Sequence, residues 1–155
     1  GGARLLQWLG RSGGGVPRVE LEPARAIHAA VAGAIARGLV RSCHDLCEGG
    51  LGVAVAESCL AGGLGAAVNL GSVPRSGGLD DDAAVLFSES APRYLLETTA
   101  KQADALAAAL GSVPHAVIGT LTAQPRLVIT GFGPRPLVDA NLEELTRAYR
   151  TGLGL

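Results

Sequence analysis

The hydrophobic pattern of the chain changes period several times, and each change predicts a new element. After Pro23, apolar side chains recur at helical spacing through Ile27, Val31 and Ile35, and Gly38 follows them. Proline is tolerated in the first turn of a helix, and glycine commonly stands just beyond the last turn. The pattern therefore predicts a helix that begins near Pro23 and ends at Gly38.

Three further segments are predicted as helices. The run GLGVAVAESCLA follows the glycine pair at 49–50 and ends at a second pair, 62–63. An alanine-rich segment covers residues 100–110, and a third helix is expected at 142–150. Asn141 precedes that last helix by one position and Glu144 follows three residues later, which is the spacing of a capping box.

Six segments are predicted as strands. Residues 64–70 alternate apolar and small positions, as in a half-buried strand. Residues 83–87 (AAVLF) form a continuous apolar run, which is typical of a central strand. The other four segments are 39–43, 93–99, 115–122 and 125–131. Helices and strands in this mixed order predict an α+β fold, an α/β sandwich in which helices pack on a mixed sheet.

The chain has 155 residues, which is the size of one domain with its own core. Residues 1–18 are rich in glycine and lack periodicity apart from the run ARLLQWL. We expect them to be a linker or the end of a preceding domain, and residues 19–155 to form the domain itself. The sequence contains no Met, which suggests a processed chain or an excised piece of a longer protein.

Charge and composition exclude several classes of partner. Thirteen basic and fourteen acidic side chains give a net charge of -1, which argues against nucleic-acid binding. No apolar run is long enough to span a membrane. Three cysteines, an odd number, fit a reducing compartment, so we expect a cytoplasmic protein.

Candidate chemistry concentrates in RSCHDLCEGGLG, residues 41–52. Cys43, His44 and Cys47 are close enough in sequence to bind zinc, with Cys59 as a fourth ligand, but the paired ligand knuckles of a structural zinc site are missing. Alternatively, Cys47 is a nucleophile activated by a helix N-terminus, with His44 as its base. Both are minor hypotheses, because cysteine is commonly a small buried apolar residue.

A third hypothesis uses the backbone of the same stretch. A strand, a short loop, Gly49–Gly50 and a helix follow one another, and free N–H groups at a helix N-terminus bind phosphate. His44 and Asp45 are either an oriented pair, in which the carboxylate holds the imidazole tautomer, or a partly buried ring beside a turn-capping Asp. The sequence alone leaves these two alternatives open.

Polar side chains also follow the predicted strand at 83–87. Ser88, Glu89 and Ser90 with Arg93 would suit a polyhydroxy ligand at the carboxyl end of a strand, or would simply form a turn. Three consecutive acids, Asp80 to Asp82, suggest magnesium. Consecutive side chains point in different directions, however, so a solvated loop at residues 72–82 is the better interpretation.

Two motifs together suggest a family. HDLCEGGLGVAVAESCLAGGLGAAVNL, followed by AVLFSESAPRYLLET, resembles the C-terminal domain of the phosphoribosylformylglycinamidine synthase family, which belongs to the aminoimidazole-ribonucleotide-synthetase-like superfamily. The resemblance runs from about Val19 to Tyr149. At Cys47 the family has Ser, and a thiol is a poorer hydrogen-bond donor than a hydroxyl.

The resemblance implies an ATP-dependent ligase of de novo purine synthesis, with N-terminal synthetase domains and a glutaminase domain or subunit as partners. ATP and magnesium would be bound mostly by those other domains, and no catalytic or metal-binding residue is expected in this chain, so it would be inactive alone. The alternatives are another member of the superfamily (aminoimidazole ribonucleotide synthetase, selenophosphate synthetase, thiamine-phosphate kinase or a hydrogenase maturation factor) or a non-enzymatic scaffold. Candidate ligand or interdomain contacts are His44, Asp45, Gly49, Gly50, Ser88, Glu89, Ser90 and Arg93.

Overall fold

The computed structural model describes residues 3–13, 15, 17–75 and 79–152, and its chain forms two compact units. The first unit combines Gly1–Ala54 with Phe87–His115, and the second combines Val55–Leu86 with Ala116–Leu155. Each unit is therefore built from segments that are distant in the sequence. Ser76, Gly77 and Gly78, part of the loop predicted at 72–82, lie outside the described residues.

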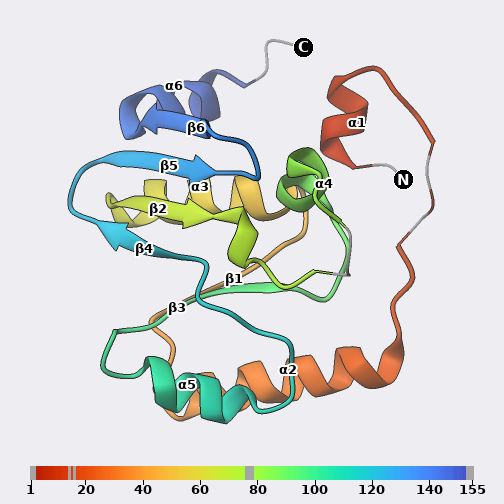
Figure 1. Ribbon diagram of the computed structural model, residues 1–155, viewed down its shortest axis with the longest axis vertical. Helices are drawn as coiled ribbons and strands as arrows, with labels where there is room; N and C mark the ends of the chain where they lie inside the picture. Colours follow the sequence, from red (N-terminus) through yellow and green to blue (C-terminus); the bar gives the residue numbers. More distant parts are fainter. Residues whose placement is uncertain (1–2, 14, 16, 76–78, 153–155) are drawn as a thin grey trace. The chain divides into compact units, whose positions relative to one another are not determined.

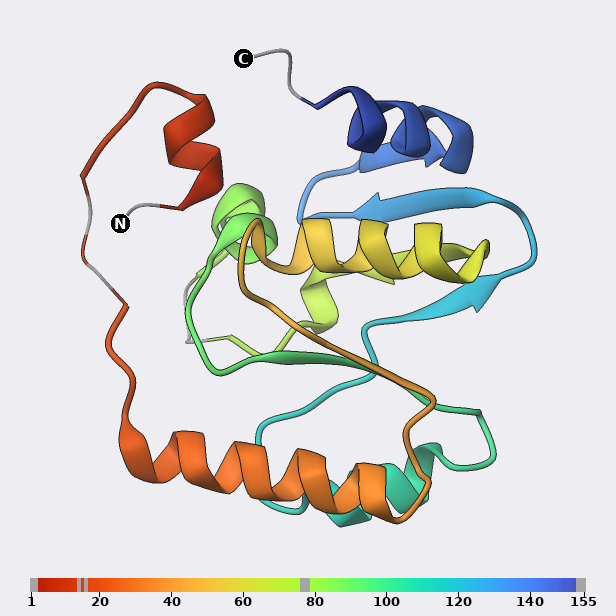
Figure 2. The same cartoon turned by 180° about the vertical axis from the view of Figure 1, so that it is seen from behind.

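The first unit contains a two-stranded sheet and three helices. Strand β1 (Ser42–Asp45) pairs antiparallel with β3 (Tyr94–Glu97). Helix α2 (Leu21–Ala36) and helix α5 (Ala103–Leu110) lie side by side in both views of the ribbon (Figures 1 and 2). A short helix, α1 (Arg4–Trp8), belongs to the same unit.

The core of this unit lies between α2 and α5. It consists of Val31, Ala34, Leu39, Leu106 and Leu110. Residues three or four apart on a helix share a face, so each helix presents its apolar positions to the other. The predicted helix at 23–38 is confirmed: α2 begins two residues before Pro23, and Gly38 follows its end with a φ of 68°.

The second unit contains a four-stranded sheet in the order β4-β2-β5-β6. Strands β2 and β5 are parallel, and the other two pairs are antiparallel, so the sheet is mixed as the sequence predicts. The bounds are Gly65–Asn69 for β2, Gly119–Thr122 for β4, Arg126–Thr130 for β5 and Pro136–Asn141 for β6.

Two helices accompany this sheet. Helix α3 (Gly50–Gly62) enters the second unit at Val55, and from there it runs along the sheet (Figure 2). Helix α6 (Leu142–Thr151) follows β6. The predicted capping box is present, because the Asn141 side chain accepts from the Glu144 N–H and the Glu144 carboxylate accepts from the Asn141 N–H. The α+β class with a mixed sheet is thus confirmed.

The predicted central strand at 83–87 is wrong, because these residues form helix α4 (Asp82–Phe87). A short apolar run fits a buried helical turn as well as a buried strand, and both Val85 and Leu86 are buried here. The local signal for a helix is Asp81, whose Oδ1 accepts a hydrogen bond from the Ala84 N–H at 2.7 Å.

Three other differences have simple causes. Strand β6 was not predicted; it begins at Pro136, and proline is tolerated at the beginning of an edge strand. Helix α1 lies within residues 1–18, the segment expected to be a linker or the end of a preceding domain, which stays a prediction. Strand β1 spans Ser42–Asp45 rather than residues 39–43, which places His44 inside the strand. Across the described residues, no helix is long and apolar enough to cross a bilayer.

Candidate functional site

The register of β1 and β3 brings two turns together in the first unit. Asp45 at the end of β1 pairs with Tyr94 at the start of β3, and the Leu46 N–H donates to the Arg93 carbonyl at 2.9 Å. Residues 46–50, the glycine turn, and residues 88–93, the serine turn, therefore leave the same end of the small sheet. All eight candidate residues predicted from the sequence lie on these two turns or on the last two positions of β1.

The glycine turn requires both of its glycines. Gly49 and Gly50 have φ values of 77° and 62°, a left-handed conformation that side chains with a Cβ rarely adopt. A Cβ added to Gly49 would also lie 2.7 Å from the Cβ of Val53. The sequence pattern Gly-Gly before a helix thus reflects a backbone requirement.

Both N–H groups of the glycine pair have partners within the protein. The Gly49 N–H donates to Glu89 Oε1 at 2.9 Å, and the Gly50 N–H donates to the Cys47 carbonyl at 3.2 Å. The phosphate hypothesis depends on these N–H groups being free. The phosphate hypothesis stays a prediction, and in this structure the Gly49 N–H is paired with the Glu89 carboxylate.

Arg93 stabilises the serine turn through hydrogen bonds to two carbonyl groups of the same turn. Its Nε donates to the Ser90 carbonyl at 2.9 Å, and its Nη2 donates to the Ser88 carbonyl. Burial lowers the pKa of Arg93. The hydroxyls of Ser88 and Ser90 lie 3.1 Å apart. The turn follows helix α4, so its expected place at the carboxyl end of a strand was wrong.

His44 and Asp45 are neighbours on β1 and do interact. His44 Nδ1 lies 2.7 Å from the Asp45 carbonyl oxygen and 3.8 Å from the carboxylate Oδ1. A carbonyl only accepts, so Nδ1 carries the proton in this contact. The Asp45 carbonyl oxygen therefore accepts a hydrogen bond from the imidazole, and the Asp45 carboxylate lies nearby.

Two residues of the site were not anticipated from the sequence. The Arg4 N–H donates to Glu89 Oε1 at 2.8 Å, and Arg4 Nη2 lies 3.0 Å from Glu48 Oε1. Helix α1 thus reaches both turns, although residues 1–18 gave no motif. The only sequence signal was the short apolar run ARLLQWL.

The thiols differ in exposure. Cys43 and Cys47 are exposed, whereas Cys59 is buried in α3. Burial raises the pKa of Cys59; burial and the charge of Asp45 raise the pKa of Cys43. Within residues 3–13, 15, 17–75 and 79–152, no group of three or more His, Cys, Asp or Glu side chains is arranged to hold a metal ion.

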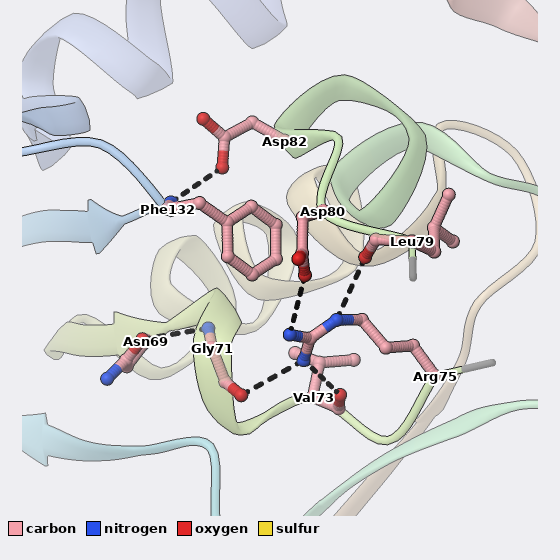
Figure 3. A network of polar contacts seen from close by, with 8 residues as sticks. All are labelled: Asn69, Gly71, Val73, Arg75, Leu79, Asp80, Asp82 and Phe132. Atoms are coloured by element: carbon pink, nitrogen blue, oxygen red, sulfur yellow. Dashed lines mark hydrogen bonds and ion pairs between the residues drawn. The ribbon is translucent and has the colours of Figure 1, made fainter. Parts of the chain in front are cut away.

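The three consecutive acids lie in the second unit, and each has its own structural partner; Figure 3 shows those of Asp80 and Asp82. Asp80 pairs with Arg75 at 3.0 Å, and Asp82 Oδ1 accepts from the Phe132 N–H at 2.9 Å. Asp81 accepts from an N–H in the first turn of α4. The three carboxylates make three different contacts, and the loop predicted at 72–82 is shorter than expected, because Ser72 ends η1 (Leu70–Ser72) and Asp82 begins α4.

The chain is similar to known proteins in sequence. The family model described as AIR synthase related protein, C-terminal domain, matches residues 1–131. Phosphoribosylformylglycinamidine synthase subunit PurL of Rhodospirillum rubrum is 41% identical over 133 residues, which is 84% of this chain and 17% of that protein. The PurL subunit of Moorella thermoacetica is 38% identical over 155 residues, 99% of this chain and 20% of that protein.

Solved structures show the same fold. Thermotoga maritima PurL complexed with FGAR matches with a TM-score of 0.76 at 21% identity, covering 84% of this chain and 22% of that one. The same protein complexed with ATP matches at 0.71 and 23% identity, covering 78% and 21%. Escherichia coli HypE matches at 0.64 and 20% identity, covering 89% and 44%. The chain spans about a fifth of the length of the curated relatives it matches.

Proposed function

The chain belongs to the family of AIR synthase related proteins, C-terminal domain, and we propose that it acts as this domain in an ATP-dependent phosphoribosylformylglycinamidine synthase. The observation that carries the proposal is the 41% identity with a PurL subunit over 133 residues. In the proposed reaction, ATP phosphorylates the amide oxygen of formylglycinamide ribonucleotide. Ammonia then displaces the phosphate, and formylglycinamidine ribonucleotide, ADP and phosphate are formed.

We assign this chain a supporting part in that reaction. The glycine turn, the serine turn and the end of β1 contribute ligand or interdomain contacts, and His44, Ser88 and Ser90 are among the candidates for them. Glu89 and Arg93 instead hold the turns in place, which their hydrogen bonds to Gly49 and to the turn carbonyls support. Asp45 fixes the His44 ring through its carbonyl oxygen.

The remaining parts of the activity are assigned to other domains. ATP and magnesium would be bound mostly by N-terminal synthetase domains, and ammonia would come from a glutaminase domain or subunit. Residues 1–18, which include α1, would be the end of a preceding domain, and the boundary at residue 19 stays a prediction. A soluble biosynthetic ligase of this kind would work in the cytoplasm.

The proposal is tested on a full-length protein that contains this sequence. Incubation with formylglycinamide ribonucleotide, ATP, magnesium and ammonium should yield formylglycinamidine ribonucleotide and one ADP for each product, measured by mass spectrometry and a coupled ADP assay. The 155-residue chain alone should give no turnover. A full-length protein that binds ATP but leaves the ribonucleotide unchanged would contradict the proposal.

Another activity within the superfamily is the main competitor. The likeness to HypE, at 20% identity, shows the fold and does not favour hydrogenase maturation. Sequence identities of 34–44% to PurL subunits favour the synthase. In the same assay, ATP consumption that is independent of the ribonucleotide would point to such a member, and absence of any ATP consumption would point to a scaffold.

A further inference from the structure

Glu89 joins three segments that are far apart in the sequence. Its Oε1 accepts one hydrogen bond from the Gly49 N–H, 40 residues away, and another from the Arg4 N–H, 85 residues away. Both donors are backbone groups, and the acceptor is a carboxylate. Hydrogen bonds to an ionised acceptor are about twice as strong as neutral ones, so one oxygen atom strongly couples the two backbone sites.

Helix α1 depends on this oxygen for its N-terminal cap. Ala3 occupies the N-cap position and has no side chain that could accept a hydrogen bond, so the sequence of α1 supplies no cap of its own. Five residues are also too few for a helix that is stable by itself. Glu89, which lies on the serine turn, caps the helix instead, because its Oε1 accepts from the Arg4 N–H, the first N–H of α1.

Gly49 depends on the same oxygen for a different reason. The residue is buried, and its left-handed conformation directs the N–H toward the serine turn. A buried donor without a partner is costly, and the Glu89 carboxylate removes that cost. Arg93 in turn fixes the turn that carries Glu89, because it binds the carbonyls on both sides of this residue, those of Ser88 and Ser90.

A second contact holds α1 in the same place. Arg4 Nη2 lies 3.0 Å from Glu48 Oε1, and Glu48 directly precedes Gly49. Both side chains are mostly exposed, at 59% and 72%, so this pair is weak in water. The Arg4–Glu48 ion pair therefore adds little to the attachment of α1, and the hydrogen bond to Glu89 supplies most of it.

We propose that Glu89 is a positioning residue that latches α1 onto the glycine turn, so that the order of α1 and the conformation of the turn depend on one carboxylate. Withdrawal of Glu89 releases the N-terminus of α1 and exposes the Gly49 N–H at the same time. A ligand or partner that moves the serine turn consequently changes all three segments together. This coupling does not depend on the reaction proposed above.

Amide hydrogen exchange, followed by NMR on the 155-residue chain, tests the latch. Glu89→Ala should speed exchange about tenfold or more at both Gly49 and Arg4, as expected for loss of a hydrogen bond to a charged group. Glu89→Gln, which keeps an acceptor oxygen, should give a smaller increase at both. Glu48→Ala should leave Gly49 unchanged. The control is Glu20→Ala in the same unit. Glu20 occupies the N-cap position of α2, but its side chain makes no capping hydrogen bond there.

Chemical rescue separates a carboxylate latch from general loosening. Formate added to the Glu89→Ala chain should restore protection at Gly49, because it replaces the missing acceptor. Faster exchange at only one of Gly49 and Arg4, or no rescue by formate, would overturn the proposal. If the Ala variant does not fold, Glu89→Gln decides: a coupled increase at both amides supports the latch, and an increase at one alone refutes it.

Discussion

The guanidinium carbon of Arg75 lies 4.7 Å from the centroid of the Phe132 ring (Figure 3). The same group donates to the carbonyls of Gly71 at 3.0 Å and Leu79 at 2.9 Å, and it pairs with Asp80. One side chain thus connects the 3-10 helix η1 (Leu70–Ser72) with the loop that follows it and with Phe132, two residues after the end of β5. The planar guanidinium donates several hydrogen bonds while it lies over the Phe132 ring, and the ammonium group of Lys cannot reproduce this arrangement.

Arg75→Lys should therefore lower the free energy of unfolding by about 1–3 kcal/mol, because several hydrogen bonds of a charged group and the ring contact are lost. Urea denaturation followed by circular dichroism measures the change. The matched control is Arg25→Lys on the exposed face of α2, which should stay within about 0.5 kcal/mol of the original chain. Equal stabilities of the two variants would contradict the role of Arg75.

Gly62 and Gly65 should respond in opposite ways to replacement by Ala.

 They lie three positions apart along the chain, at the end of α3 and the start of β2. A Cβ on Gly65 would lie 2.7 Å from the backbone nitrogen of Arg126, whereas a Cβ on Gly62 meets nothing within 4 Å. Gly65→Ala should therefore destabilise the chain by about 1–3 kcal/mol through overpacking against β5.

Gly62→Ala should be neutral or should stabilise the chain by up to about 1 kcal/mol, because Ala loses less backbone entropy in a helix. Thermal and urea unfolding of both variants provide the comparison. Gly65→Ala with unchanged stability would mean that β2 does not approach β5 as closely as described.

The capping box of α6 predicts a third effect. Asn141→Ala removes the acceptor for the Glu144 N–H and should cost about 1 kcal/mol, with a loss of helical signal at the C-terminal end. Glu144→Ala keeps that bond and removes only the reciprocal one to the Asn141 N–H, so it should cost less. The opposite ranking of the two variants in urea denaturation would contradict the capping assignment.

Thiol reactivity should follow exposure and charge. Since burial and the Asp45 carboxylate raise the pKa of Cys43 above the ordinary 9.0, less of this thiol is ionised at pH 8 than in a free cysteine. Asp45→Asn should lower that pKa and speed alkylation of Cys43 by iodoacetamide, measured by peptide mass spectrometry. Asp104→Asn on α5 is the control and should have no effect. Cys59, which is buried, should react only after unfolding.

The pair formed by Arg126 and Asp139 should contribute to stability in a pH-dependent way. The hydrogen bond from Arg126 lowers the pKa of Asp139 below its ordinary value of 3.8. The contribution is therefore present above pH 3.8 and is lost as the pH falls through the lowered pKa. Asp139→Asn should flatten the stability curve in this acidic range. The effect should be small and should weaken in high salt, because both groups are at the surface.

Several local features of this protein could be predicted from its sequence. Helix α2 follows from apolar spacing and the glycine after it, and the start of α6 follows from Asn141 and Glu144. The glycine pair before α3 also marks a real backbone requirement. Each of these signals acts over a few residues, so no knowledge of distant segments is needed.

Other features depended on partners that are distant in the sequence. The apolar run at 83–87 is too short for its periodicity to distinguish a helix from a strand. In the fold it forms α4, with Val85 and Leu86 buried. Strand β6 was not predicted, and it forms by pairing with β5 at the edge of the sheet, where Pro136 is tolerated at its start.

The sequence by itself determined the α+β class, most of the helices and the family, because these depend on local periodicity and on motif spacing. The tertiary structure decided how the two candidate turns are used. The pairing of Asp45 with Tyr94 sets both turns at one end of a sheet, and Glu89 then reaches the Gly49 and Arg4 N–H groups. Strand register and the partner of a buried N–H are non-local properties, so the sequence alone could not show that the Gly49 N–H pairs with the Glu89 carboxylate.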